Sequence, residues 1–225
     1  MRDGFYRQTG AVEGRHWWFR HRRRLLTALL DQEISELPCP DAREALPEAA
    51  LLRVDANRLG DCFAAGSFDL VTVLNVLYHQ WVSDERVVLD QVRRILRPGG
   101  RLLLTEPAFE SLRRRHDRVD LGARRYTRRR LVEIVEGAGF AVQRASCFNA
   151  IGLAPAVVAA AIDRLRGAGD TEAAVERTGE LHVPPVPLNW LLLELCRLEL
   201  LWLRGVGDLP FGVGVLVLAR TEGES

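Results

Sequence analysis

The apolar residues of this chain alternate between helical and strand spacing. Three segments carry them on one side only, at residues 17–30, at residues 84–96 and between Thr127 and Gly139, which predicts amphipathic helices. Short runs rich in Val, Leu and Phe predict strands at residues 51–54, 68–74, 101–105, 141–148 and 213–219. Strands that alternate with helices indicate a layered α/β sheet.

Residues at the ends of these segments sharpen their limits. Ser83 and Thr127 are predicted to cap the helices that follow them, and Pro98-Gly99-Gly100 and Gly139 are predicted to end those helices. Phe68 to Leu74 is apolar almost throughout, which is typical of a strand buried on both faces of a parallel sheet.

Two further helices are predicted in the C-terminal part, at residues 155–165 and 188–204. The second is apolar around much of its circumference, which favours burial; contact with a membrane surface or a second copy is the alternative. We therefore expect a single domain over residues 1–225, in which a lead-in helix within 1–30 precedes a core at 51–148. A helical insertion at 149–212 separates that core from the last strand at 213–219.

Composition narrows the class of protein. The chain is 48% hydrophobic and 27% charged, as expected for a soluble globular protein. Its net charge of +1 gives no reason to expect a nucleic-acid partner. The four cysteines and five histidines lack the spacing of a metal site, so we expect free thiols and no bound metal. Because the first residues also lack the apolar core of a signal peptide, the predicted location is the reducing cytoplasm.

Several motifs occur in a consistent order. Phe68-Asp69-Leu70-Val71 precedes Arg94-Ile95-Leu96-Arg97-Pro98-Gly99-Gly100, with His16-Trp17-Trp18-Phe19 before them and Leu209-Pro210-Phe211-Gly212 after them. This order resembles the class I methyltransferases that depend on S-adenosylmethionine (SAM), and in particular a bacterial type-11-like methyltransferase domain. The resemblance covers roughly residues 13–30 and 51–220.

The resemblance implies a Rossmann-like sheet with strand order 3-2-1-4-5-7-6 and SAM over the carboxyl ends of the first four strands. By position, Asp55 and Ala56 match the adenine end of strand 3, and Asn75 matches a contact to the cofactor. His79 matches a proton acceptor or substrate contact, and Glu106 matches the edge of the active site. The residues alone also permit plainer roles, with Asp55 as a turn acid and His79 as an ordinary loop histidine.

One part of the family pattern is missing. No glycine lies between Gly14 and Gly60, and only residues 31–50 separate the lead-in helix from the strand at 51–54. Since one βαβ unit takes about 30 residues, we expect strands 1 and 2 to be absent, together with the glycine-rich turn that holds SAM. Two hypotheses stay open: a methyltransferase with unusual SAM use that acts on a small-molecule or lipid-linked substrate, or a non-catalytic homologue that serves as a binding or partner protein. A truncated gene is a third.

Overall fold

The computed structural model describes residues 15–29, 54–114, 117, 121–165 and 184–222. They belong to two compact units, one within residues 1–52 and 169–207 and the other within residues 53–168 and 208–225. Of the two helices in the predicted insertion, α7 (Leu153–Leu165) belongs to the second unit and α9 (Val186–Gly205) to the first. The expected single-domain organisation remains a prediction.

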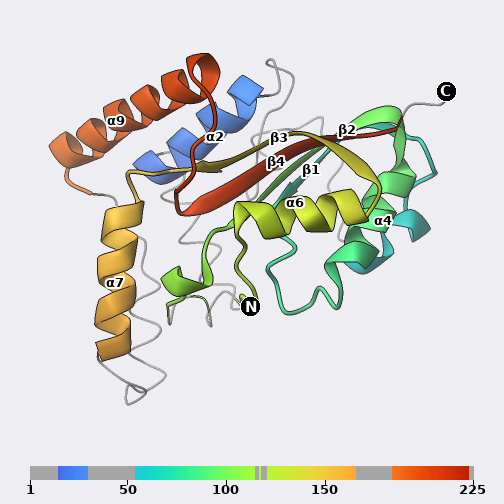
Figure 1. The fold of residues 1–225 in the computed structure, drawn as a ribbon, viewed down its shortest axis with the longest axis horizontal. Helices are drawn as coiled ribbons and strands as arrows, with labels where there is room; N and C mark the ends of the chain where they lie inside the picture. The colour runs from blue at the N-terminus through green and yellow to red at the C-terminus, as the bar shows by residue number, and fades with distance from the viewer. Residues whose placement is uncertain (1–14, 30–53, 115–116, 118–120, 166–183, 223–225) are drawn as a thin grey trace. The chain divides into compact units, whose positions relative to one another are not determined.

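The second unit is built on a four-stranded mixed sheet. Its strands are β1 (Phe68–Leu74), β2 (Leu96–Pro107), β3 (Phe140–Phe148) and β4 (Gly214–Thr221), in the order β1-β2-β4-β3 (Figure 1). β1 and β2 are parallel, and β4 is antiparallel to both of its neighbours. This order corresponds to strands 4-5-7-6 of the predicted sheet and confirms that half of it.

The described residues contain no strand paired with the other edge of β1, which fits the expected lack of strands 1 and 2. The strand predicted at residues 51–54 lies outside the described residues except for Val54, which is not in a strand. β1 was expected to be buried on both faces, but only Val73 is fully buried. That expectation was wrong because β1 lies at the edge of the described sheet, where residues from both of its faces line a pocket.

Two helices, α4 (Glu85–Ile95) and α6 (Arg128–Gly137), cover one face of this sheet (Figure 1). Residues two apart on a strand point to the same face of the sheet. On the face covered by α4 and α6, these apolar strand residues pack against apolar residues of the two helices and form one core. Its members include Val88 and Val92 of α4, Leu131 and Val135 of α6, Leu102 and Leu104 of β2, and Val215 and Val217 of β4. Burial of each such side chain contributes roughly 1.5–3 kcal/mol to folding.

The ends of α4 differ from the prediction. Asp84, not Ser83, is the N-cap: its Oδ1 accepts the N–H of Arg86 at 2.9 Å. The Ser83 hydroxyl instead lies 3.5 Å from Asn57 Oδ1. At the other end Leu96 is already extended and begins β2, so the helix stops before Pro98-Gly99-Gly100 rather than at it.

The predicted limits of α6 are closer to the structure. Thr127 caps it as expected, since its Oγ1 accepts the N–H of Arg130 at 3.2 Å. The helix ends at Gly137, and Gly139 takes the left-handed φ of 81° that brings the chain into β3. A side chain at this position would be strained, which explains the glycine.

The first unit contains two packed helices, α2 (Trp17–Leu29) and α9. Both were predicted within one or two residues of their observed ends. His21 Nε2 lies 2.9 Å from Glu199 Oε1, and both side chains are buried. α9 is buried on one side only, at Leu193, Cys196, Glu199 and Leu203, and exposes Trp190, Leu191, Leu198, Leu201 and Trp202. The expected burial around most of this helix was therefore wrong. None of the described helices is long and apolar enough to cross a membrane.

Candidate functional site

The chain leaves β1 through a tight backbone turn at Asn75. This residue has a left-handed φ of 53°, which asparagine adopts more readily than most residues. Its N–H donates to the carbonyl of Thr105 on β2 at 2.8 Å. The loop that follows, residues 75–83, therefore starts at the shared carboxyl end of the two parallel strands.

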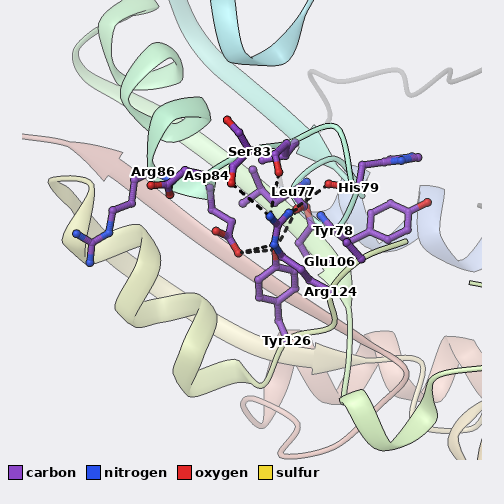
Figure 2. Close-up of polar contacts among 12 residues, drawn as sticks. Leu77, Tyr78, His79, Ser83, Asp84, Arg86, Glu106, Arg124 and Tyr126 are labelled. Carbon is purple, nitrogen blue, oxygen red and sulfur yellow. Dashed lines mark hydrogen bonds and ion pairs between the residues drawn. The ribbon is translucent and has the colours of Figure 1, made fainter. Parts of the chain in front are cut away.

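The Glu106 carboxylate holds the first part of this loop from inside (Figure 2). Its side chain is fully buried, and its Oε1 accepts the N–H groups of Val76 at 3.1 Å and Leu77 at 2.8 Å. Its Oε2 accepts the N–H of Tyr78 at 3.1 Å. Hydrogen bonds to an ionised group are about twice as strong as neutral ones, so this single side chain sets the path of three residues. Sequence position alone suggested an acid at the edge of the active site, whereas Glu106 binds backbone in the interior.

Arg124 holds the carbonyl groups of the same loop (Figure 2). Its Nη1 donates to the carbonyls of Leu77 and His79, each at 3.2 Å. Its Nη2 lies 2.9 Å from the Val82 carbonyl, and its Nε lies 3.4 Å from Glu85 Oε1. The rigid fork of guanidinium donors suits several carbonyls at once. The loop is thus fixed through its N–H groups by one residue and through its C=O groups by another.

Tyr126 adds a neutral contact to this arrangement. Its hydroxyl lies 3.1 Å from both the Leu77 carbonyl and Glu85 Oε1, and the ring is almost fully buried. Burial, together with the charges of Glu106 and Glu85, raises the pKa of Tyr126 well above its ordinary range. The phenol therefore stays protonated and acts as a hydrogen-bond donor.

His79 lies within a series of three aromatic rings. Its imidazole is 4.6 Å from the Tyr78 ring at 50° and 5.3 Å from the Trp81 ring at 9°, a parallel stack. Nδ1 is buried and has no hydrogen-bond partner in the described part of the chain. Burial lowers the pKa of His79 below its ordinary value, so the ring is neutral at pH 7. Trp81, which the sequence analysis did not single out, is 57% exposed.

Asp55 caps the short 3-10 helix η1 (Ala56–Asp61). Its Oδ1 accepts the backbone N–H of Asn57 at 2.9 Å and the side-chain Nδ2–H of Asn57 at 2.8 Å. These bonds lower the pKa of Asp55, which is exposed to solvent. Asn57 Nδ2 also lies 3.1 Å from the Trp81 carbonyl, so it links the Asp55 turn to the loop after β1. The turn-acid interpretation of Asp55 matches this geometry.

A pocket of about 360 Å³ lies beside β1. Its wall is apolar except for Thr72 and is formed by Ala56, Leu59, Phe63, Phe68, Leu70, Val71, Val73, Val76, Val88 and Ile95. The size falls within the usual range for small-ligand sites. Ala56 lines this pocket, while Asn75 and His79 lie on the loop at the end of β1, and Asn57 joins that loop to Asp55. In the described residues no group of three or more His, Cys, Asp or Glu side chains is arranged to hold a metal ion.

The candidate site is built from two segments that are far apart in the sequence, residues 55–85 and residues 105–126. Sequence reasoning found only part of it. Arg124 was considered only with Arg125, as one of several Arg clusters that could bind an anion or lie on a solvated face, and Tyr126 was given no role. Asn57 was missed altogether, because a small polar residue in a turn carries no distinctive pattern. A tryptophan in the loop directly after a predicted strand is a signal that could have pointed to Trp81.

Comparison with known proteins agrees with this fold. A family model described as a methyltransferase domain matches residues 14–104. A 37.1 kDa protein of transposon TN4556 from Streptomyces fradiae is 37% identical over 90 residues, which are 34% of this chain and 25% of that protein. The highly reducing polyketide synthase ltbA of Aspergillus luteorubrus is 40% identical over 63 residues, 28% of this chain and 2% of the synthase. The chain thus spans a quarter or less of the length of these two relatives.

Among solved structures, the complex between the Haloferax volcanii Trm112 methyltransferase activator and a methyltransferase contains a similar chain. The TM-score is 0.52 at 18% identity, and the match covers 99% of this chain and 96% of that chain. At this identity the likeness concerns the fold alone. Residues 14–104 therefore match a methyltransferase domain, and the sheet continues from there in the order 4-5-7-6 expected for class I SAM-dependent methyltransferases.

Proposed function

We propose that this protein binds SAM by its adenosyl end in the apolar pocket beside β1 and transfers the methyl group to a small-molecule or lipid-linked acceptor. The observation that supports this proposal is the presence of three features beside β1 and after its carboxyl end. They are the pocket lined by Ala56, the exposed carboxylate of Asp55, and the fixed loop that carries His79.

The pocket suits the flat, apolar faces of an adenine ring. Ala56, Leu59 and Phe63 supply contact without polar groups that would need partners. The ionised carboxylate of Asp55 is next in the chain and can accept a hydrogen bond from an amino or hydroxyl group of the nucleoside. SAM, once bound, supplies a methyl group activated by its sulfonium.

His79 is proposed to accept a proton from the acceptor. It is neutral at pH 7 because burial lowers its pKa, and a general base must be unprotonated to act. Since Nδ1 is enclosed, Nε2 is the nitrogen assigned to this task. The contribution of the chain is mainly orientation, which can supply about 7–11 kcal/mol of barrier reduction in well-aligned reactions.

The competing proposal is a non-catalytic homologue that binds a partner. It is favoured by the way polar groups near the pocket are used. Glu106 occupies the N–H groups of residues 76–78, and Asn57 occupies one oxygen of Asp55. Those groups support the fold, so they are not available to hold the ribose and methionine parts of SAM.

The outward face of α9 supports a partner in either case. Trp190, Leu198 and Leu201 are each about 62% exposed on a helix whose opposite side packs on α2. A lipid surface, a second copy of this chain or an activator protein like that of the solved relative would each cover apolar surface there. The free thiols Cys62, Cys147 and Cys196 support a reducing, cytoplasmic location.

Titration calorimetry with SAM tests the proposal. We expect saturable binding with a dissociation constant below about 100 μM, equivalent to roughly −5.5 kcal/mol. Ala56→Phe, which fills the pocket, should abolish the heat, and Val157→Phe at an exposed site on α7 should leave it unchanged. No heat at millimolar SAM with folded wild-type protein would instead support the non-catalytic homologue.

A further inference from the structure

Trp81 is an exposed side chain on a segment whose backbone is fixed. The indole is 57% exposed, yet the next residue, Val82, is buried. The carbonyls on both sides of Trp81, at His79 and Val82, accept hydrogen bonds from Arg124, and the Trp81 carbonyl lies 3.1 Å from Asn57 Nδ2. Large apolar side chains of a loop usually gain free energy by turning inward. Here the backbone contacts keep this one outward.

One face of the indole is covered by the parallel imidazole of His79, at 5.3 Å and 9°. Tyr78 contacts that imidazole in turn, at 4.6 Å. The spacing of 5.3 Å between nearly parallel rings is that of an offset stack. A further flat ring on the outer face of Trp81 would continue the same series. Because the loop is already ordered, such a ligand would bind without the usual cost of fixing the protein side.

We propose that the outer face of Trp81 is a stacking platform for a planar aromatic ligand, and that the methyl acceptor belongs to this class. The identification of the ligand as the acceptor rests on the proposed function. Two contacts favour a neutral ring over a cation. The Glu85 carboxylate contacts Arg124 and Tyr126, and the Arg124 guanidinium places a positive charge under the same loop at the His79 and Val82 carbonyls.

Calorimetric titration with a matched pair of probes tests this platform. 2-Naphthol carries a flat ring system, and decahydro-2-naphthol has the same carbon skeleton and hydroxyl without aromaticity. We expect 2-naphthol to bind at least about fivefold more tightly, which is the low end of measured stacking effects. Trp81→Ala should weaken 2-naphthol by a similar factor, and Trp81→Phe should retain most of the affinity. Trp190→Ala, at a tryptophan that is 62% exposed on α9, is the control and should change nothing.

Three results would overturn the platform: equal affinity for the saturated probe, an equal loss in Trp190→Ala, or displacement of 2-naphthol by tetramethylammonium. If Trp81→Ala does not fold, the indole N–H proton signal of Trp81 in wild-type protein gives the same answer. The ring current of a bound naphthol should shift it, and no shift at saturation counts against the proposal. SAM is titrated separately with the wild-type protein. Absence of SAM binding together with intact naphthol binding would reject the proposed function and keep the platform.

Discussion

Glu106 Oε1 lies 2.8 Å from the backbone nitrogen of Leu77, although 29 residues separate them in the chain. This contact joins the end of β2 to the loop after β1. It also turns an acid that looks catalytic by position into an internal support for His79. The shape of the candidate site therefore depends on a residue that does not reach the pocket.

Replacement of Glu106 should destabilise the protein strongly. Glu106→Ala leaves one buried and two partly buried N–H groups without their acceptor, and we expect the free energy of unfolding to fall by more than about 3 kcal/mol. Urea unfolding followed by circular dichroism measures this. Glu133→Gln on the exposed side of α6 should cost less than about 1 kcal/mol. Equal effects would show that the buried contacts carry no special weight.

Replacement of Arg124 by lysine should lower the stability of the protein. An ammonium group cannot reach the carbonyls of Leu77, His79 and Val82 together, so Arg124→Lys should cost about 1–3 kcal/mol of unfolding free energy. The matched control is Arg129→Lys, whose side chain is 90% exposed and pairs only with Glu133 among the described contacts. The control should lie within about 0.5 kcal/mol of wild type. A tolerated Arg124→Lys would contradict the role assigned to the guanidinium.

Replacement by alanine should lower thermal stability at Gly212 but not at Gly205. A Cβ at Gly212 would lie 2.2 Å from the Phe148 carbonyl oxygen, which is backbone and cannot move aside cheaply. Gly205 ends α9 and has open space around a Cβ. Thermal melting should show a loss of several degrees for Gly212→Ala and no loss for Gly205→Ala, since about 1 kcal/mol shifts Tm by roughly 2–4 °C at this size.

Protonation of His79 should destabilise the folded state. Its pKa is lowered by burial, so the unfolded chain, whose histidine titrates near 6.5, binds the proton more readily. The free energy of unfolding should therefore fall as the pH drops below about 6.5, and His79→Gln should lessen that fall between pH 7 and 5. Nuclear magnetic resonance titration of the imidazole gives the direct check. A midpoint at or above 6.5 would contradict the assigned burial.

Alkylation should distinguish the described cysteines. Cys62 is exposed, whereas Cys147 and Cys196 are buried. Burial and the charge of Glu199 raise the pKa of Cys196 to about 12, so almost no thiolate forms at pH 8. Iodoacetamide in native buffer, followed by peptide mass spectrometry, should modify Cys62 well before the other two. In urea all three should react, and early labelling of Cys196 would argue against its buried position.

Much of the framework could be predicted because its signals are local. The apolar run Phe68–Leu74 became β1 with both ends correct, and Thr127 caps α6 as expected. The resemblance assigned Ala56 to the end of strand 3, and Asn75 and His79 to the end of strand 4. In the structure Ala56 lines the pocket beside β1, and Asn75 and His79 lie on the loop that follows β1. Their functional roles stay predictions.

Local sequence patterns gave the wrong prediction in two situations. In one, two neighbouring residues both suit the same N-cap, and in the other, the exposure of a helix depends on which elements pack against it. Ser83 and Asp84 both suit an N-cap, and the contact of Ser83 with Asn57, 26 residues away, accompanies the choice of Asp84. α9 looked buried all round, yet only one partner helix among the described residues covers it. A sequence pattern gives the number of apolar residues but not the number of surfaces available to cover them.

The sequence by itself determined the kind and order of the elements, because hydrophobic spacing and turn residues act within a few positions. It also indicated a resemblance to the class I methyltransferases. The motifs keep the order of that family although the segment between residues 30 and 51 is short. Only the tertiary structure decided what Glu106, Arg124 and Trp81 do. Their roles depend on hydrogen bonds across 24–47 residues, which exist only after β1 and β2 have paired and the chain has closed around them.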